Sequence, residues 1–193
     1  ITSDLVKWRG SLTRQTTALD LQNGYKQIAA DLKETKTWLA NNGLKDSDLE
    51  ISPVFMNEIY KNYQDNSPKE YSLRQTIVVQ SGEINKVSDL AKNVQELINK
   101  GVLFATDSLE YYSSEVPKLR VELLAEAVQD AKARAKELAE SNGQSVGSLK
   151  QAASGVVQVL SSNSADISDY GAYDTSSIEK EIMVTVRATF NLR

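Results

Sequence analysis

The hydrophobic pattern of the first 112 residues alternates between two periods, and this order limits the fold more than any other feature. A period of two marks a strand with one buried face, whereas a period between three and four marks a helix. Strand patterns cover 4–14, 48–60, 71–80 and 102–112, and helical patterns cover 17–42 and 87–101. The order predicts β-α-β-β-α-β, the ferredoxin-like core in which two helices cover one face of an antiparallel sheet.

Glycine and proline residues predict irregularities within these elements and the ends of the helices. Gly10 interrupts the first strand pattern and predicts a bulge there. Pro53 cannot donate a hydrogen bond, so the strand over 48–60 is expected to be an edge strand or to be bulged. Gly43 and Gly101 predict the ends of the two helices.

The remaining third of the chain adds a helix and two strands. The stretch "AVQDAKARAKELAESNG" belongs to a helix predicted over 117–142, which Gly143 closes. Its expected buried face consists of Leu124, Ala127, Val128, Ala131, Ala135, Leu138 and Ala139. Strands are predicted near 155–160 and over 182–192, on either side of a long polar loop over 161–177.

The predicted fold class is therefore α+β. A ferredoxin-like β-α-β-β-α-β core is extended by a long third helix and two C-terminal strands. The length of 193 residues favours one domain over 1–193. The alternative is a subdivision into 1–113 and 114–193.

Composition excludes several classes of function. The chain has no cysteine and no histidine, which removes disulfides, zinc–thiolate sites and Ser-His-Asp or Cys-His catalysis. Its net charge is −4, and no cluster of Lys and Arg suits a nucleic acid. We therefore expect no enzyme activity, no cofactor and no nucleic-acid partner. No apolar run in the chain is long enough to span a bilayer, and the start at Ile1 suggests a removed signal peptide or lipid anchor.

Essentially the whole chain, from the first strand to Arg193, resembles a known family, and the most specific features lie in its C-terminal half. A strand ending in "ATDSLEYY" leads into the alanine-rich helix, and the chain closes with "IMVTVRATFNL". The most specific pattern consists of four alanines and one leucine of the helix at fixed spacing, followed by two glycines: Ala127, Ala131, Ala135, Leu138, Ala139, Gly143 and Gly147. These features resemble the SIMPL-domain family, which includes the YggE-like and the 26 to 28 kDa periplasmic antigen-type bacterial envelope proteins.

The resemblance implies a bacterial periplasmic or envelope protein of unknown precise role. Members of the family have been linked to oxidative-stress tolerance and to large ring-like homo-oligomers, and an animal member is linked to kinase signalling. The resemblance implies no catalytic residues. We therefore expect a homo-oligomer in the periplasm or on the cell envelope, with an unknown ligand.

Charged residues of the third helix allow a functional and a simpler interpretation. Glu122, Glu126 and Asp130 lie four apart and could form an acid–base pair, but a solvated helix face explains them more simply. Asp130–Arg134 and Lys136–Glu140 have the spacing of exposed ion pairs. The alanines favour close packing within the chain, with a subunit contact as the alternative.

Three aspartates of the late loop could suggest a calcium site. Asp166, Asp169 and Asp174 lack the alternating acidic register and the later bidentate glutamate of a calcium loop. We therefore expect no metal site there.

Five tyrosines are the candidate interface residues. Tyr60, Tyr63 and Tyr71 surround the predicted hairpin turn, and Tyr170 and Tyr173 lie in the late loop. Aromatic side chains on protruding segments are enriched at interfaces, whereas covering a sheet edge is the simpler role. The favoured hypothesis is a self-assembling, non-enzymatic envelope protein; the alternatives are a binding module that uses the open sheet face, or an enzyme built on carboxylates, Lys, Arg, Tyr or Ser.

Overall fold

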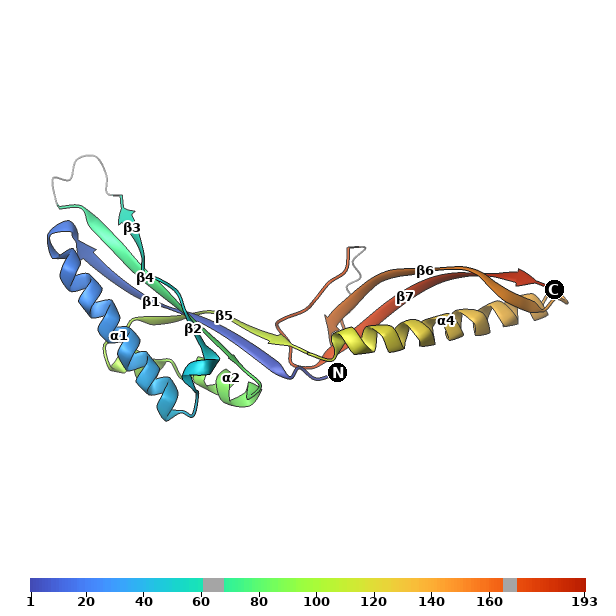
Figure 1. Ribbon diagram of the computed structural model, residues 1–193, viewed down its shortest axis with the longest axis horizontal. Helices are drawn as coiled ribbons and strands as arrows, with labels where there is room; N and C mark the ends of the chain where they lie inside the picture. The colour runs from blue at the N-terminus through green and yellow to red at the C-terminus, as the bar shows by residue number, and fades with distance from the viewer. Residues whose placement is uncertain (61–67, 165–169) are drawn as a thin grey trace. The chain divides into compact units, whose positions relative to one another are not determined.

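The computed structural model describes residues 1–60, 68–164 and 170–193, which form two compact units (Figure 1). One unit is Asp4–Tyr111, and the other combines Ile1–Ser3 with Tyr112–Arg193. Helices and antiparallel strands occur in both units, so the predicted α+β class is confirmed. Whether the chain folds as one domain stays a prediction.

The Asp4–Tyr111 unit contains a five-stranded sheet. Its strands are β1 (Leu5–Thr17), β2 (Leu49–Ile51), β3 (Phe55–Ile59), β4 (Glu70–Ser81) and β5 (Phe104–Tyr112). Its helices are α1 (Leu21–Asn41), α2 (Ile84–Lys92) and α3 (Gln95–Asn99), with short 3-10 turns at Ala18–Asp20 and Asp46–Asp48. The strand order is β2-β4-β1-β5, with β3 also paired to β4, as the split βαβ arrangement requires. Helices α1 and α2 lie on the same side of this sheet (Figure 1).

The core of this unit lies between the sheet and α1. Alternation along β1 buries Val6, Trp8 and Leu12 on the helix side. The Trp8 ring meets Trp38 of α1 edge-on, with centroids 6.4 Å apart, and meets Phe104 of β5 at 5.6 Å. Three aromatic rings from α1, β1 and β5 thus form the centre of the core.

Gly10 makes room for one of these rings, and the predicted bulge is wrong. The register of β1 with β4 runs without interruption from Val6 to Thr17. A Cβ atom at Gly10 would lie 2.1 Å from Cζ of Phe104. The glycine is therefore explained by the close approach of the Phe104 ring.

Replacing Gly10 with alanine is expected to lower the free energy of unfolding by about 1–3 kcal/mol, because the added methyl group overpacks the core. Urea titration followed by tryptophan fluorescence measures this, since Trp8 and Trp38 are the two tryptophans of the chain. Gly82→Ala is the matched control, because the nearest atom to its new Cβ lies at an ordinary contact distance of 3.4 Å. Equal stability of the two variants would contradict the explanation.

Two predicted elements of this unit are divided in the structure. The strand predicted over 48–60 is interrupted around Pro53, giving β2 and β3, and the Ser52 hydroxyl accepts a hydrogen bond from the Thr76 amide (2.9 Å). The expected edge position is confirmed, because β2 and β3 each pair with β4 along one edge of the sheet. The helix predicted to end at Gly101 is wrong as a single element, because the chain leaves helical geometry between α2 and α3.

A half-buried ion pair joins α1 to β1, and sequence patterns did not indicate it. Arg14 donates two hydrogen bonds to the carboxylate of Asp31, from Nε at 2.5 Å and from Nη2 at 2.7 Å. The same Nη2 donates to the carbonyl of Gly101 at 2.6 Å. The bidentate contact with Asp31 connects β1 to α1, and the bond to Gly101 connects β1 to the turn before β5.

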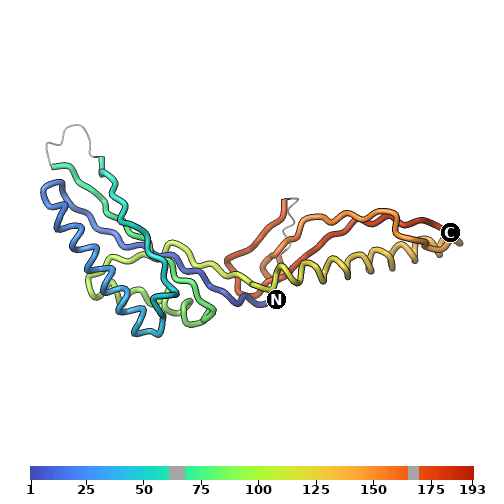
Figure 2. The backbone as a smooth tube through the Cα atoms, in the orientation of Figure 1, coloured from blue at the N-terminus to red at the C-terminus, as the bar shows by residue number. Residues whose placement is uncertain are grey.

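The second unit consists of a long helix against a β-hairpin (Figure 2). Helix α4 spans Val116–Glu140, and β6 (Val146–Ser161) pairs with β7 (Lys180–Leu192). Gly143 has a φ of 70°, which confirms its predicted place after the helix. Strand β6 begins well before the predicted 155–160. Its first residues are mostly Gly, Ser, Lys and Ala, which show no strand alternation in the sequence. They are extended because they pair with β7.

Candidate functional site

Helix α4 buries one narrow face against the hairpin. The expected face is half-buried at Leu124, Ala127, Val128, Ala131 and Ala135, and Ala139 is 4% exposed. The prediction is wrong for Leu138, whose side chain is 74% exposed. The buried row advances in steps of four residues through Ala131, Ala135 and Ala139, and each step drifts about 40° around the helix, away from Leu138.

The helix covers the two strands of the hairpin unequally. It packs mainly against β7, whose inward residues alternate with polar ones: Ile182, Val184, Val186, Ala188 and Phe190. Strand β6 receives less cover from α4. Leu149 pairs with Phe190 across the hairpin yet is 47% exposed. Apolar surface of the N-terminal part of β6 therefore remains accessible to another chain.

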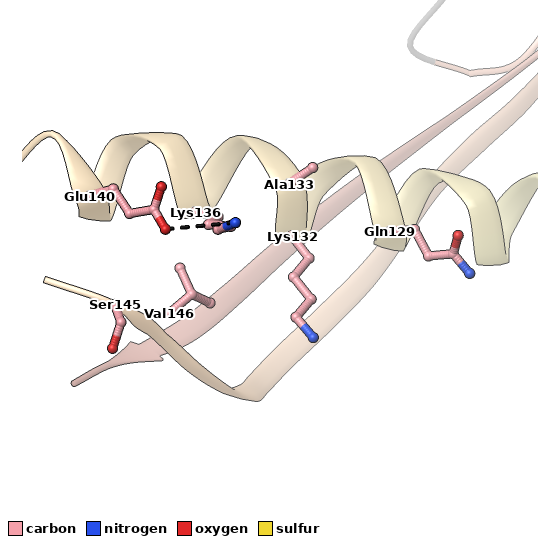
Figure 3. Close-up of a pocket in the computed structure, with 7 residues that line it drawn as sticks. All are labelled: Gln129, Lys132, Ala133, Lys136, Glu140, Ser145 and Val146. Atoms are coloured by element: carbon pink, nitrogen blue, oxygen red, sulfur yellow. Dashed lines mark ion pairs between the residues drawn. The ribbon is translucent and has the colours of Figure 1, made fainter.

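A groove follows the boundary between α4 and the start of β6. Its volume is about 360 Å³. The helix lines it with Gln129, Lys132, Ala133, Lys136 and Glu140, and Ser145 and Val146 line it where β6 begins. In Figure 3, Lys132 extends from α4 on the side where β6 begins. The groove thus combines the ammonium groups of Lys132 and Lys136 with the Glu140 carboxylate, which pairs with Lys136, and with an apolar residue of β6.

The outer edges of the hairpin are paired only at its base, among the described residues. Val159 of β6 pairs with Tyr173, with hydrogen bonds from Val159 N to Ala172 O and from Asp174 N to Val159 O, both 2.8 Å. On the other side, Thr2 pairs with Glu179 next to β7. The rest of each edge presents backbone N–H and C=O groups, with which a further strand can form hydrogen bonds.

A buried lysine organises the base of the hairpin. The side chain of Lys180 is fully buried, and its Nζ donates to the carbonyls of Asp174 and Ser177, the latter at 2.7 Å. The Asp174 carboxylate lies 3.5 Å from the same Nζ, and the Tyr173 ring centroid lies at 5.6 Å. Burial lowers the pKa of the Lys180 ammonium, against the opposing effect of Asp174.

Asp174 is committed to this structural network. Its carboxylate accepts hydrogen bonds from the backbone and hydroxyl groups of Ser176 and Ser177. These bonds, those of the two hydroxyls foremost, hold the pKa of Asp174 well below its usual range. The aspartate therefore stabilises the turn that precedes β7. Asp166 and Asp169, the other two aspartates of the late loop, lie outside the described residues.

The candidate tyrosines are divided between the two units. Tyr60 is 88% exposed after β3, whereas Tyr71 is half-buried on β4, between Thr16 and Glu58. Tyr63 lies outside the described residues.

The other two tyrosines differ in environment. Tyr170 is 97% exposed. Tyr173 stacks at a tilt on Tyr112, with centroids 5.7 Å apart, and its hydroxyl accepts a hydrogen bond from the Ser113 amide at 3.0 Å. Intramolecular contacts thus explain Tyr71 and Tyr173, and an interface role for the whole set stays a prediction.

The charges of α4 lie in solvent. The predicted ion pairs are confirmed, at 2.9 Å for Asp130–Arg134 and 3.7 Å for Lys136–Glu140. Glu122 and Glu126, which could have been an acid–base pair, are exposed on the helix. An exposed pair lacks the burial that would separate two carboxyl pKa values.

The open face of the five-stranded sheet is largely polar, although Phe55, which pairs with Arg74 on this face, is 58% exposed. Residues that alternate with the buried ones of β1 point away from the helices. Ser11 and Arg74 both donate to the Asp107 carboxylate there, at 3.1 and 2.8 Å. These side chains are engaged with one another, so this face offers less to a ligand than the groove beside α4.

The described ranges contain no group of three His, Cys, Asp or Glu side chains placed to hold a metal ion. Across the same three ranges, no helix combines the length and the apolar character that crossing a membrane needs.

Comparison with known proteins identifies the sequence family. A family model described as SIMPL, protein of unknown function (DUF541), matches residues 1–190. A search of curated proteins gives no match. The match extends from the first strand of the sheet through most of the terminal hairpin, so it includes both units and the groove.

Proposed function

We propose, on the premise that the chain belongs to the SIMPL family of unknown function, that it is a non-enzymatic protein of the bacterial cell envelope that works as a self-assembled homo-oligomer. Self-assembly is the part of this proposal that the geometry of the molecule supports. The envelope location, and a contribution to stress tolerance, rest on the resemblance to the family.

The observation that carries self-assembly is the pair of open hairpin edges. Beyond Val159 on β6 and Lys180 on β7, whose backbone bonds to Ile1, strand pairing among the described residues joins β6 and β7 only to each other. A two-stranded hairpin is marginally stable unless a helix or further strands cover it. Here one helix covers it on one side, and apolar side chains such as Leu149 remain exposed. A further copy of the same chain could pair with the open edges of β6 and β7 and cover the exposed apolar side chains.

The absence of enzymatic activity is proposed from composition and from the exposure of charged groups. Without histidine and cysteine, catalysis would need carboxylates, Lys, Arg, Tyr or Ser in a sheltered cluster. The described ionisable group with the deepest burial, Lys180, is held by backbone carbonyls at the base of the hairpin. A panel of hydrolase substrates should therefore give no turnover above background.

The native mass in solution tests self-assembly. Light scattering coupled to size-exclusion chromatography should give a defined multiple of the 21.3 kDa subunit mass over a range of loading concentrations. A strict monomer at high micromolar concentration would contradict the proposal. Release of the natural protein from cells by osmotic shock tests the envelope location separately, because a cytoplasmic marker should stay behind.

A further inference from the structure

Three Asn-Gly pairs occur in the chain, and the bond between the two residues is chemically reactive in such pairs. They are Asn23–Gly24, Asn42–Gly43 and Asn142–Gly143. A glycine has no side chain to hinder its backbone nitrogen, so this nitrogen can approach the side-chain carbonyl carbon of the preceding asparagine. The reaction requires both groups to leave the contacts that they make in the folded chain. The structure therefore determines which of the three pairs can react.

The Asn142–Gly143 pair lies in the turn that follows α4. The Gly143 amide donates a hydrogen bond to the Glu140 carbonyl at 3.1 Å. All residues over 140–145 are exposed. Among the described residues, no group forms a hydrogen bond with the side-chain amide of Asn142. Opening this turn breaks backbone hydrogen bonds at the end of a helix but removes no apolar side chain from the core, so it costs little free energy.

The Asn42–Gly43 pair lies in a similar turn after α1, but its side chains anchor it. Gly43 and Gly143 both have positive φ values, of 83° and 70°. The side-chain amide of Asn42, however, donates to the Trp38 carbonyl at 2.9 Å. The next residue, Leu44, is 5% exposed. Opening this turn therefore pulls Leu44 out of the core as well as breaking the bond to Trp38.

The Asn23–Gly24 pair lies inside a helix. It belongs to α1, and the Asn23 side-chain amide donates to the Asp20 carboxylate at 3.2 Å. Gly24 is buried, and a Cβ atom there would lie 2.8 Å from Cβ of Thr16 on β1. Freeing this backbone nitrogen requires the helix to unwind and to separate from the strand.

We propose that Asn142–Gly143 is a site of spontaneous deamidation in the folded protein, unlike the other two pairs. The Gly143 nitrogen loses its proton to hydroxide and attacks Cγ of Asn142. The new N–Cγ bond closes a five-membered succinimide ring, and the Cγ–Nδ2 bond breaks with release of ammonia. Water then opens the ring at either carbonyl, which leaves an aspartyl or an isoaspartyl linkage. The net reaction exchanges ammonia for water and needs no other reactant.

Deamidation changes both the charge and the backbone of the turn between α4 and β6. The new carboxylate lies at the C-terminal end of α4, where the helix dipole and the nearby Glu140 carboxylate both disfavour negative charge. An isoaspartyl linkage also adds one carbon to the backbone, so the bond from Gly143 to Glu140 cannot keep its geometry. Glu140 and Ser145, on either side of the turn, line the groove beside α4 (Figure 3). The modification therefore alters one end of that groove. This inference is independent of the proposed self-assembly.

Peptide mass mapping of the incubated protein tests the proposal. The purified wild-type chain is kept folded at mildly alkaline pH, digested at intervals, and analysed for the mass gain that accompanies conversion of an amide into a carboxylate. Electron-transfer fragmentation distinguishes aspartyl from isoaspartyl products. We expect Asn142 to convert about tenfold faster or more than Asn42 and Asn23, because opening the other two turns disrupts buried contacts.

Incubation in concentrated urea separates the effect of the fold from that of the sequence. In the unfolded chain all three pairs have glycine after asparagine and none has a protecting contact, so their rates should become similar. Asn142→Gln should remove the reaction at this position in the folded chain, because the longer side chain would have to close a less favourable six-membered ring. Asn42→Gln is the matched control and should leave conversion at Asn142 unchanged.

Two results would overturn the proposal. One is conversion of the three pairs at equal rates in the folded protein, which would show that the turn after α4 does not open more readily than the others. The other is an Asn142 that stays intact in the folded protein while it converts in urea. Far-UV circular dichroism at each interval checks that the incubated chain is still folded.

Discussion

Replacing Trp8 with alanine is expected to lower the free energy of unfolding of the Asp4–Tyr111 unit by about 3–5 kcal/mol. The Trp8 side chain is buried between Trp38 and Phe104, and the two rings meet it edge-on. Its removal would leave a cavity that rigid neighbours from a helix and a second strand cannot fill. Urea unfolding followed by far-UV circular dichroism measures the loss.

Trp8→Phe is the control for this prediction. It keeps an aromatic ring in the core but removes the hydrogen bond from Nε1 of Trp8 to the Thr106 hydroxyl, which is 3.2 Å long. We expect a loss of about 1–2 kcal/mol. Equal losses in the two variants would show that the ring contacts contribute little to stability.

Much of this unit could be predicted because local signals agree with the tertiary structure. Strand alternation, helix periodicity and the glycines Gly43 and Gly101 locate most element boundaries, and both glycines have positive φ values of 83° and 80°. The sequence does not distinguish the two explanations for Gly10, because a bulge and a close ring contact both favour a glycine within a strand. The partner that distinguishes them, Phe104, is far away along the chain.

The helix–hairpin unit was harder to predict for a physical reason. Strand β6 depends on its neighbour β7 more than on its own residues, so 146–154 showed no strand signal. The exposure of Leu138 depends on the direction in which the buried row drifts around α4. The candidate groove lies between segments that are close only after folding, although the charges that define its wall were visible in the sequence.

Pairwise contacts were the least predictable features. The Arg14–Asp31 pair and the Lys180 network each join groups whose residue types are common and whose spacing is unremarkable. Long charged side chains are usually solvated, so their burial cannot be inferred without the surrounding backbone carbonyls. Such contacts fix the geometry of a fold whose element order is already determined by the hydrophobic pattern.

Replacing Lys180 with methionine is expected to lower the free energy of unfolding by about 3 kcal/mol. Methionine fills a similar volume but leaves the carbonyls of Asp174 and Ser177 without their donor, next to a carboxylate that has lost its counter-charge. Circular dichroism during urea titration measures the loss. Lys150→Met is the matched control, since that lysine is exposed and its replacement should have little effect.

The tryptophan signal separates the two units in the same experiment. Trp8 and Trp38 both lie in the Asp4–Tyr111 unit. If the units unfold independently, Lys180→Met should shift the circular dichroism transition and leave the fluorescence transition in place. A shift of both transitions would show that the chain unfolds as one cooperative domain.

Stability as a function of pH gives an independent check on the buried ammonium of Lys180. Burial lowers the pKa of this group in the folded chain below its ordinary value of 10.5. Between the lowered pKa and 10.5, the unfolded chain binds a proton that the folded chain does not, so folding becomes more favourable as pH rises. Below the lowered pKa both states are protonated and the contribution is constant. The stability difference between the wild type and Lys180→Met should therefore widen toward pH 10, and a difference that narrows would contradict burial as the dominant influence on this lysine.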